Sequence, residues 1–597
     1  MRTRVADYIT QKIQEARADA VFLITGGMIM HLSDALYKNK KLKVICCHHE
    51  QAAVMAAEAY GRFTGKLGVA YVTTGPGALN TITGVVGAYV DSSPTIIVSG
   101  QSKRSLARIT GPRQFPLQGF DSLPLFKHIT KYAVMLDDIS KVRYEVEKCI
   151  YLAQAHRVGP VYIECPVDLQ DTCFDPEEFP GYTPQQEDYS KLSKDLEKKI
   201  ELAGEEIKKS KRPCILAGAG VRLSGAIEDL HKFLEKTGIP IITSRLGMDI
   251  IGDDHPLFVG RPGTYGDRAA NFTVQNCDLL LVIGCRLGIG LVSYDFQNFA
   301  PKAKKIMVDV DEKELIKPSV VPDIPIKADA KLFIKTLSGK LGNYKLKNSE
   351  WVKRTREWKR NYPVDLPEYI KEKEGINSYH FMRVFSDRMT EGDVFLVDTG
   401  SCFHVHAQAF KVKYGQRHVI TGGLSTMGYM PGSLGVATAN HGKDVYCITG
   451  DGSIQMNIQE LETIAYNKLP IKIVLLNNQG YLLIRHTQNN FCEGHLIGEG
   501  PKTGVGFPDM KKIANAYGIH YMKVSEEGEL EKKIDELQAY KGPVIFEVMT
   551  PPNQLLMPRV ASKKLENGQM ASMPYDNMFP FLPTEEYNKT SLIEDVQ

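Results

Sequence analysis

The sequence lacks the features that mark several large classes of protein. No uninterrupted apolar run reaches the ~18 residues that a membrane helix needs, and the polar start has no signal-peptide core of about 7–15 apolar residues. It has no Lys/Arg stripe of the kind that nucleic-acid binding needs, and its net charge is only +3. Its 11 cysteines are odd in number and scattered, which favours a reducing compartment over a disulfide framework. We therefore expect a cytoplasmic protein that binds neither membranes nor nucleic acids.

What the chain does have is an alternation of short β-branched runs with helical patterns, which predicts parallel sheets covered by helices. Its 597 residues are too many for one hydrophobic core. Polar and charged stretches divide the predicted strands into three groups. We predict an α/β protein with three doubly wound parallel-sheet domains at 1–175, 190–342 and 375–555, followed by a tail at 556–597.

The stretch "ICCHHEQAA" gathers cysteine, histidine and glutamate side chains between a predicted strand and a predicted helix. Zinc sites usually separate paired ligands by about two to four residues, and neighbouring strand residues such as Cys46 and Cys47 point to opposite faces. Both points argue against a zinc site. Glu50, at the junction of strand and helix, is the residue that we retain as a functional candidate.

Several predicted strands end in Gly-rich turns, such as "TTGPGALN", "DTGS" and "GDGS". In open α/β sheets ligands gather at the carboxyl ends of strands, where the N–H groups of the following helices bind phosphate. One such turn is weak support, but five turns in two domains predict an extended ligand that carries phosphate. These turns supply the cofactor-binding candidates Gly26, Gly27, Pro76, Asn80, Gly400, Ser401, Cys402, Gly423, Met427, Gly450, Gly452 and Ser453.

The segment "GDGSIQMNIQELETIAYNKLPIKIVLLNNQGY" predicts a metal site. Asp451 ends one predicted strand and Asn478 ends the next, so a strand–helix–strand unit can bring them together. A carboxylate and an amide oxygen suit Mg²⁺, which completes its octahedral shell with diphosphate oxygens and water. The alternative is that each residue merely stabilises a turn.

Two motifs together resemble those of a known family. "GDGS" followed by "LNNQGY" is similar to the thiamin diphosphate (ThDP) fingerprint. "HHEQAAVMAAEAYGR" with "TTGPGALNTITGV" resembles the pyrimidine-binding domain of the acetolactate synthase group, large catalytic subunit type. The resemblance covers the whole chain in the order pyrimidine-binding, central and diphosphate-binding domain.

The resemblance implies roles for individual residues. Glu50 would bond the aminopyrimidine ring of ThDP, and burial against apolar neighbours would raise its pKa. Asp451, Asn478 and the carbonyl of Gly480 would hold Mg²⁺, and Met427 would push ThDP into its bent form. The family's sites form between two subunits, so a homodimer or homotetramer is implied.

The reaction implied by the resemblance is decarboxylation of a 2-oxo acid, followed by protonation, oxidation or transfer to a second carbonyl. The central segments "LAGAGVRL" and "VDVD", with Asp309 and Asp311, resemble the FAD site of acetolactate synthases. The same fold elsewhere binds other nucleotides or none, so the sequence leaves FAD open. The rival functions are an FAD-dependent 2-oxo acid oxidase, a simple decarboxylase and a catalytically silent ThDP-binding subunit.

Two departures from the acetolactate synthase pattern concern the acceptor. The Arg-bearing "FDDR" segment is missing, and Thr487 stands where the family has a tryptophan. Both changes disfavour a second small 2-oxo acid as acceptor, and the pair of His486 and Thr487 would suit a sugar or aldehyde. We name Gln118, His486 and Thr487 as candidates for the substrate pocket.

Overall fold

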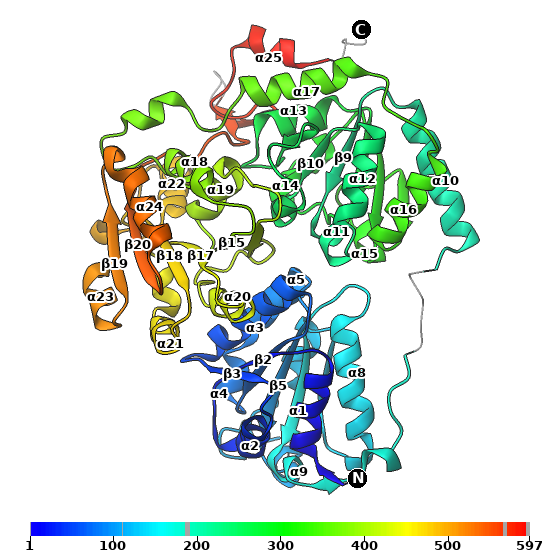
Figure 1. Cartoon of the computed structure of the whole chain (residues 1–597), viewed down its shortest axis with the longest axis vertical. Coiled ribbons are helices and arrows are strands. Elements are labelled where there is room, and N and C mark those ends of the chain that lie inside the picture. Colours follow the sequence, from blue (N-terminus) through cyan, green and yellow to red (C-terminus); the bar gives the residue numbers. More distant parts are fainter. Residues whose placement is uncertain (1, 110, 185–190, 565–569, 593–597) are drawn as a thin grey trace.

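Three six-stranded parallel sheets organise the protein (Figure 1). The computed structural model describes residues 2–109, 111–184, 191–564 and 570–592. Each sheet belongs to one domain and is flanked by helices, which confirms the predicted α/β fold with three parallel-sheet domains. Within the described residues, no helix is both long and apolar enough to span a bilayer.

The N-terminal sheet has the strand order β3-β2-β4-β5-β7-β6. Its strands are β2 (Ala20–Leu23), β3 (Lys43–Cys46), β4 (Gly68–Val72), β5 (Thr95–Gln101), β6 (Tyr132–Met135) and β7 (Val161–Pro166). Its helices are α1 (Val5–Glu15), α2 (Met30–Lys38), α3 (Glu50–Thr64), α4 (Pro76–Leu79), α5 (Ile82–Val90), α6 (Arg104–Ala107), α7 (Leu123–Ile129), α8 (Val142–Gln154) and α9 (Val167–Gln170). A short ribbon of β1 (Thr3–Arg4) and β8 (Cys173–Phe174) closes the domain.

The central sheet has the order β11-β10-β9-β12-β13-β14. Its strands are β9 (Pro213–Ala217), β10 (Ile241–Thr243), β11 (Phe258–Gly260), β12 (Leu279–Ile283), β13 (Lys304–Asp309) and β14 (Ile324–Lys327). Its helices are α10 (Lys194–Lys209), α11 (Ala219–Leu223), α12 (Ile227–Thr237), α13 (Arg268–Asn276), α14 (Ile289–Val292), α15 (Glu312–Ile316) and α16 (Ala330–Lys340). The charged span that follows forms α17 (Ser349–Asn361), and Trp351 anchors it by donating to the carbonyl of Pro213 at 2.9 Å.

The C-terminal sheet has the order β16-β15-β17-β18-β20-β19. Its strands are β15 (Val394–Val397), β16 (Arg417–Ile420), β17 (Val445–Gly450), β18 (Ile471–Asn477), β19 (His520–Val524) and β20 (Val544–Met549). Its helices are α18 (Ser378–Arg388), α19 (Ser401–Ala409), α20 (Gly432–Ala439), α21 (Glu460–Tyr466), α22 (Leu482–Phe491), α23 (Met510–Ala516) and α24 (Leu530–Ala539).

The tail returns to the central domain instead of continuing the C-terminal one (Figure 1). It contains β21 (Ser562–Lys564), β22 (Met570–Ser572) and α25 (Thr584–Thr590). Tyr575 donates to the carbonyl of Leu291 at 2.6 Å, and Arg268 donates to the carbonyl of Met578 at 3.0 Å. These contacts join the last segment to α13 and α14.

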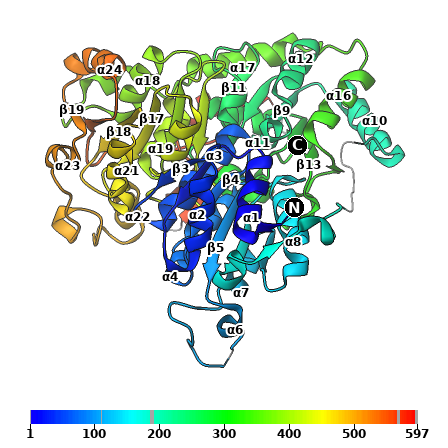
Figure 2. The same ribbon diagram turned by 60° about the horizontal axis from the view of Figure 1, so that its bottom comes forward.

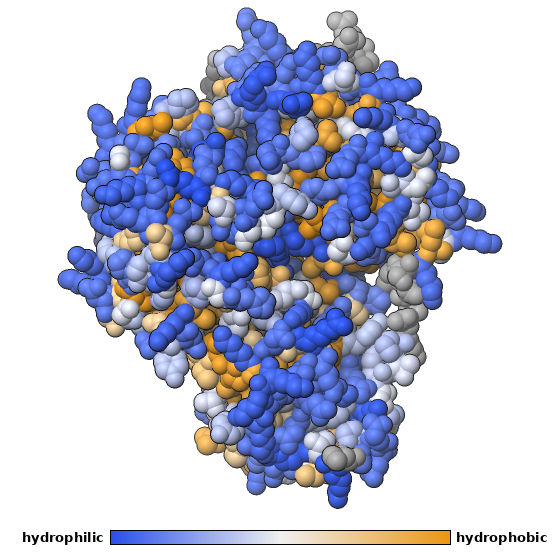
Figure 3. Space-filling view, in the orientation of Figure 1, coloured by the Kyte–Doolittle hydropathy of each residue, from blue (hydrophilic) through white to orange (hydrophobic). Residues whose placement is uncertain are grey.

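The N-terminal and C-terminal domains meet through α3 and α20, which lie side by side in Figure 1. A Cβ atom on Gly435 would lie 1.9 Å from the carbonyl oxygen of Ala56, so the two backbones touch where a side chain cannot fit. On the partner helix α3, the small side chains of the Ala-rich face also allow the two helices to approach closely. Figure 2 shows α3 among elements of the other domains, and Figure 3 shows hydrophobic residues gathered near this junction.

The α3–α20 crossing predicts a steric cost at Gly435. We expect Gly435→Ala to force the helices apart and to lower the free energy of unfolding by about 1–3 kcal/mol, the usual cost of overpacking. Thermal unfolding followed by circular dichroism measures this. The control is Gly339→Ala in α16, where a Cβ would meet no atom within 4 Å. An equal or higher unfolding midpoint for Gly435→Ala would contradict the close crossing.

Candidate active site

The predicted metal pair comes together at the carboxyl edge of the C-terminal sheet. β17 and β18 are hydrogen-bonded parallel neighbours, with Gly450 opposite Leu476 in register. Asp451 directly follows β17 and Asn478 directly follows β18. The two side chains therefore start from adjacent strand ends, as the sequence predicts.

Asp451 is a buried carboxylate held by backbone donors. Its side chain accepts hydrogen bonds from the N–H of Gly452 at 3.1 Å and of Gly480 at 2.9 Å. Burial raises the pKa of Asp451 to about 7. A cation bound to this carboxylate would offset the cost of burying its charge.

Asn478 presents an oxygen that needs a partner. Its Nδ2 donates to Ser401 Oγ at 3.3 Å, whereas its Oδ1 is buried without a hydrogen-bond partner. Buried polar atoms of this kind are rare in native proteins. One carboxylate, one amide oxygen and the neighbouring Gly480 carbonyl form a hard oxygen set that fits Mg²⁺. Among the described residues, no cluster of three or more His, Cys, Asp or Glu side chains offers a rival metal site.

A cavity of about 810 Å³ opens beside this pair and extends into the central domain. Such a volume lies within the range of small-molecule and cofactor sites. The cavity wall contains every candidate that the sequence analysis placed on the C-terminal sheet: Gly400, Ser401, Cys402, Gly423, Met427, Gly450, Asp451, Gly452, Ser453, Asn478 and Gly480. These turns thus converge on one space.

Glu50 lies outside that cavity, in a separate group of predicted residues. It begins α3, and its Oε2 accepts a hydrogen bond from Asn80 Nδ2 at 2.9 Å. The start of α4 is close, because a Cβ on Gly77 would lie 3.7 Å from Glu50 Oε1. The side chain is half-buried within the single chain, so the full burial expected for Glu50 is not reached here. In the Gly-rich turn that precedes α2, Gly26 packs against the side chain of Thr73.

The substrate-pocket candidates do not line the cavity. On α22, His486 is buried, while Thr487 is exposed and donates to the carbonyl of Leu483 at 2.9 Å. The same helix instead presents Leu483 and Ile484 to the cavity, because residues adjacent in a helix point in different directions. Gln118 is exposed, and its backbone packs against Gly75.

The two aspartates predicted in the central domain lie in different surroundings. Asp309 lines the cavity, and burial raises its pKa. Asp311 instead caps α15 and accepts a hydrogen bond from Arg157 Nη1 at 2.7 Å. Only Asp309 is therefore placed to contact a ligand in the central part of the cavity.

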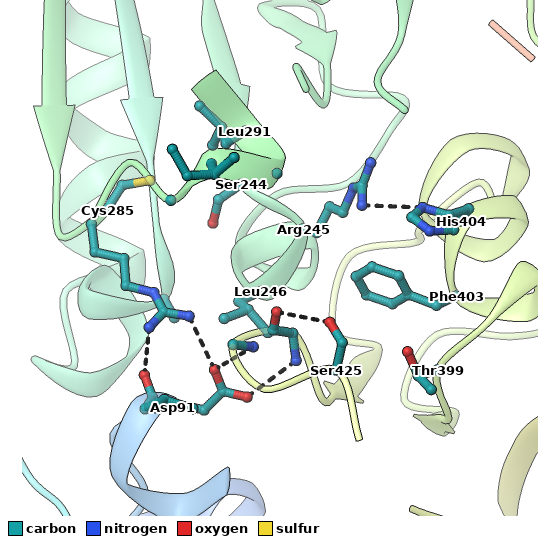
Figure 4. Close-up of a pocket in the computed structure, with 18 of the residues that line it drawn as sticks. Asp91, Ser244, Arg245, Leu246, Cys285, Leu291, Thr399, Phe403, His404 and Ser425 are labelled. Carbon is teal, nitrogen blue, oxygen red and sulfur yellow. Dashed lines mark hydrogen bonds and ion pairs between the residues drawn. The ribbon is translucent and has the colours of Figure 1, made fainter. Parts of the chain in front are cut away.

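Sequence reasoning missed a buried carboxylate where the three domains meet (Figure 4). Asp91, which ends α5, has only 1% of its side chain exposed. It accepts hydrogen bonds from the N–H groups of Gly422 at 3.1 Å and Gly423 at 2.8 Å. It also pairs with Arg62 at 3.3 Å and with Arg286 at 3.4 Å. We call these five residues the Asp91 cluster; a lone aspartate after a helix gave no signal in the sequence.

Sequence reasoning also missed Arg245, which follows β10 and lines the cavity. Its Nη1 contacts His404 Nδ1 at 3.3 Å and its Nη2 donates to the carbonyl of Tyr265 at 2.8 Å. The guanidinium carbon lies 5.2 Å from the centre of the Phe403 ring. Figure 4 shows Arg245 directed at His404, away from the Asp91 cluster.

The Asp91 cluster predicts a large loss of stability when its carboxylate is removed. We expect Asp91→Ala to lower the free energy of unfolding by about 1–3 kcal/mol, because Arg286 and two buried N–H groups lose their acceptor while Arg62 keeps its ion pair with Glu58. Urea denaturation measures this. The control is Asp195→Ala, which removes an exposed i,i+4 pair with Lys199 and should cost less than about 1 kcal/mol. Equal losses in the two variants would contradict the role of Asp91.

Comparison with known proteins identifies the family. The chain matches the family models of the thiamine pyrophosphate enzymes over residues 3–125 (N-terminal TPP binding domain), 200–337 (central domain) and 398–548 (C-terminal TPP binding domain). It is 33% identical over 572 residues to the probable acetolactate synthase large subunit of Methanocaldococcus jannaschii, with 92% of each chain covered. It is 32% identical over 566 residues to the acetolactate synthase large subunit of Porphyra purpurea, again with 92% of each covered. It is 29% identical to acetolactate synthase 3, chloroplastic, of Brassica napus, covering 93% of this chain and 85% of that one. The chain belongs to the ThDP-dependent enzymes of the acetolactate synthase type.

Proposed function

We propose that this enzyme uses ThDP and Mg²⁺ to decarboxylate a 2-oxo acid and to transfer the resulting acyl-anion equivalent to a second carbonyl compound. The observation that carries the proposal is the pairing of buried Asp451 with the unpartnered oxygen of Asn478 at the end of two adjacent strands. This pair, next to several Gly-rich turns, suits a metal-bound diphosphate.

The residues of the cavity would hold the diphosphate end of ThDP. Asp451, Asn478 and the Gly480 carbonyl would bind Mg²⁺ through oxygen. α19 begins at Ser401 in the cavity wall, and the first N–H groups of a helix, which lack partners within it, favour phosphate. Gly400 has a φ of 98°, a conformation that favours glycine, and it lets the chain turn into this helix. Met427 would support the bent form of the cofactor from the facing wall.

When bound, ThDP supplies the carbanion chemistry of the reaction. The protein's task is to move a proton near the pyrimidine ring and to keep water away. Glu50 is the candidate for the proton transfer, and the hydrogen bond from Asn80 orients its carboxylate. Pro76, Gly26 and Gly27 would shape the surrounding pyrimidine pocket.

The separation of Glu50 from the diphosphate cavity supports a site shared between two copies of the chain. Glu50 lies outside the cavity that Asp451 lines, although both residues are needed around one ThDP molecule. We therefore propose a homodimer or homotetramer in which Glu50 of one subunit faces Asp451 of another.

The central part of the cavity is the candidate site for FAD. It is walled by the turns after β9, β12 and β13, including Gly220, Gly284 and Asp309. These turns lie at carboxyl ends of parallel strands, the usual place for a nucleotide. Bound, reducible FAD with peroxide production would favour the 2-oxo acid oxidase as the function.

The metal assignment predicts a coupled loss of cofactor binding. Asp451→Ala removes the carboxylate that would hold Mg²⁺, and with it the bridge from the protein to the diphosphate. We expect at least a ~100-fold rise in the dissociation constants of both Mg²⁺ and ThDP, measured by titration calorimetry of the full chain; the fold-change corresponds to about 2.8 kcal/mol. The control is Asp311→Ala, which lies outside the cavity. Unchanged ThDP affinity in Asp451→Ala would remove Asp451 from the site.

The proposed reaction predicts CO₂ release and a carboligation product. The full chain with ThDP and Mg²⁺ is incubated with a panel of 2-oxo acids and of sugar or simple aldehydes, and products are identified by mass spectrometry. Glu50→Gln should bind ThDP yet turn over at least ~100-fold more slowly, at the scale of general acid–base effects. An aldehyde as the sole product would indicate a simple decarboxylase, and ThDP binding without CO₂ release would indicate a silent subunit.

A further inference from the structure

Arg245 is a positive charge in the cavity wall without a carboxylate partner. Three arginines line the cavity, and two of them are paired: Arg157 with Asp311 and Glu314, and Arg286 with Asp91. For Arg245, no carboxylate of the described residues lies within ion-pair distance. The charge of Arg245 is therefore available to a ligand.

The groups that Arg245 contacts directly are neutral, and the carboxylate of Asp267, which raises the pKa of Arg245, lies beyond ion-pair distance. Burial and the adjacent guanidinium hold the pKa of His404 well below its usual range, so this ring is uncharged and accepts a hydrogen bond through Nδ1. The other contacts are the carbonyl of Tyr265 and the ring of Phe403. Burial also lowers the pKa of Arg245 to about 10, which leaves it charged at neutral pH.

A guanidinium has five N–H donors, and the described hydrogen bonds of Arg245 use two of its nitrogens once each. The remaining donors form a fork of the kind that binds carboxylate or phosphate. Burying such a charge without a counter-ion costs free energy unless a ligand supplies the anion. This arrangement is typical of a recognition site and unusual for a purely structural arginine.

Arg245 lies beside the part of the cavity where the diphosphate would bind. It contacts His404 on α19, one helical turn beyond Ser401, where the diphosphate would bind. Figure 4 shows Phe403 and Thr399 on the same side. Arg245 thus lies beside the proposed cofactor position, and it reaches from the central domain to the C-terminal domain that carries Asp451.

We propose that Arg245 is a specificity-determining residue that binds the anionic group, carboxylate or phosphate, of the acceptor substrate. The proposal rests on the proposed carboligase function. It assigns the acceptor to the class of carbonyl compounds that carry a carboxylate or a phosphate, because a neutral aldehyde would leave the guanidinium without a counter-ion. Arg245 would then select acceptors by their charge, although the absence of the Arg-bearing "FDDR" segment had argued against such selection.

The test compares acceptors with and without an anionic group, using the full chain with ThDP, Mg²⁺ and pyruvate as donor. The pairs are 2-oxobutyrate with propanal, and glyceraldehyde 3-phosphate with glyceraldehyde. We expect Arg245→Met to raise the KM of at least one charged acceptor about 10- to 100-fold, as for loss of a charge-assisted hydrogen bond, and to leave the KM of its neutral partner unchanged. The pair that responds identifies carboxylate or phosphate as the group.

Two further variants test whether Arg245→Met acts on acceptor binding or changes the enzyme in a general way. Arg245→Lys keeps the charge but loses the fork, so its rise in KM should be smaller. Arg354→Met removes a surface arginine outside the cavity and should change neither KM. The unfolding midpoint of Arg245→Met should stay the same or rise, because an unpaired charge is removed. A fall in that midpoint, with both acceptors of each pair equally affected, would show a structural role and overturn the proposal.

Binding measurements separate this proposal from the function on which it rests. Titration of oxamate, an unreactive 2-oxo acid analogue, into the ThDP-loaded protein should show weaker binding to Arg245→Met even if no turnover occurs. Absence of CO₂ release in the wild type would defeat the carboligase function but leave this readout intact. If the affinity for ThDP or for ADP falls and acceptor KM values do not, the anion belongs to a cofactor and the proposal is wrong.

Discussion

Burial of the Asp91 carboxylate constrains how the three domains fit together. An ionised carboxylate inside a protein is stable only when charged or polar donors surround it. Here the N-terminal domain supplies Arg62, the central domain Arg286, and the C-terminal domain the N–H groups of Gly422 and Gly423. Displacing any one domain would leave this charge partly unpaired. The loop that bears Ser425 and the wall that bears Cys285 are thereby held in one arrangement (Figure 4).

Within this frame, the two groups of residues that we propose as halves of a catalytic site do not meet in the single chain. Asp451 and Asn478 lie in the large cavity, and Glu50 with Asn80 lies in another part of the N-terminal domain. The close crossing of α3 and α20 keeps the first turn of α3 fixed relative to the C-terminal domain. A second copy of the chain could complete two sites at once only if the spacing between these two groups of residues is fixed. The close crossing of α3 and α20 would provide that fixed spacing.

The fold and one half of the site were predictable because they depend on local patterns. Alternating strands and helices specify parallel sheets, and Asp451 and Asn478 follow neighbouring strands, so topology alone brings them together. Asp91 and Arg245 were not predictable, since their partners come from distant segments and each is a single charged residue without a motif. Thr487 stays a prediction: it lies outside the cavity of the single chain, because a family resemblance does not fix which face of α22 a side chain occupies. The full burial expected for Glu50 is not reached in the single chain.

The cavity wall, which is built by more than one domain, suggests how the substrates of such enzymes can diverge. Its lining comes from all three domains, while the turns that we propose to bind diphosphate come from one of them. A substitution in the central domain, such as one at Arg245, can therefore change which compound is accepted without touching the turns that bind the cofactor. Selection can therefore act on substrate recognition and on cofactor binding separately.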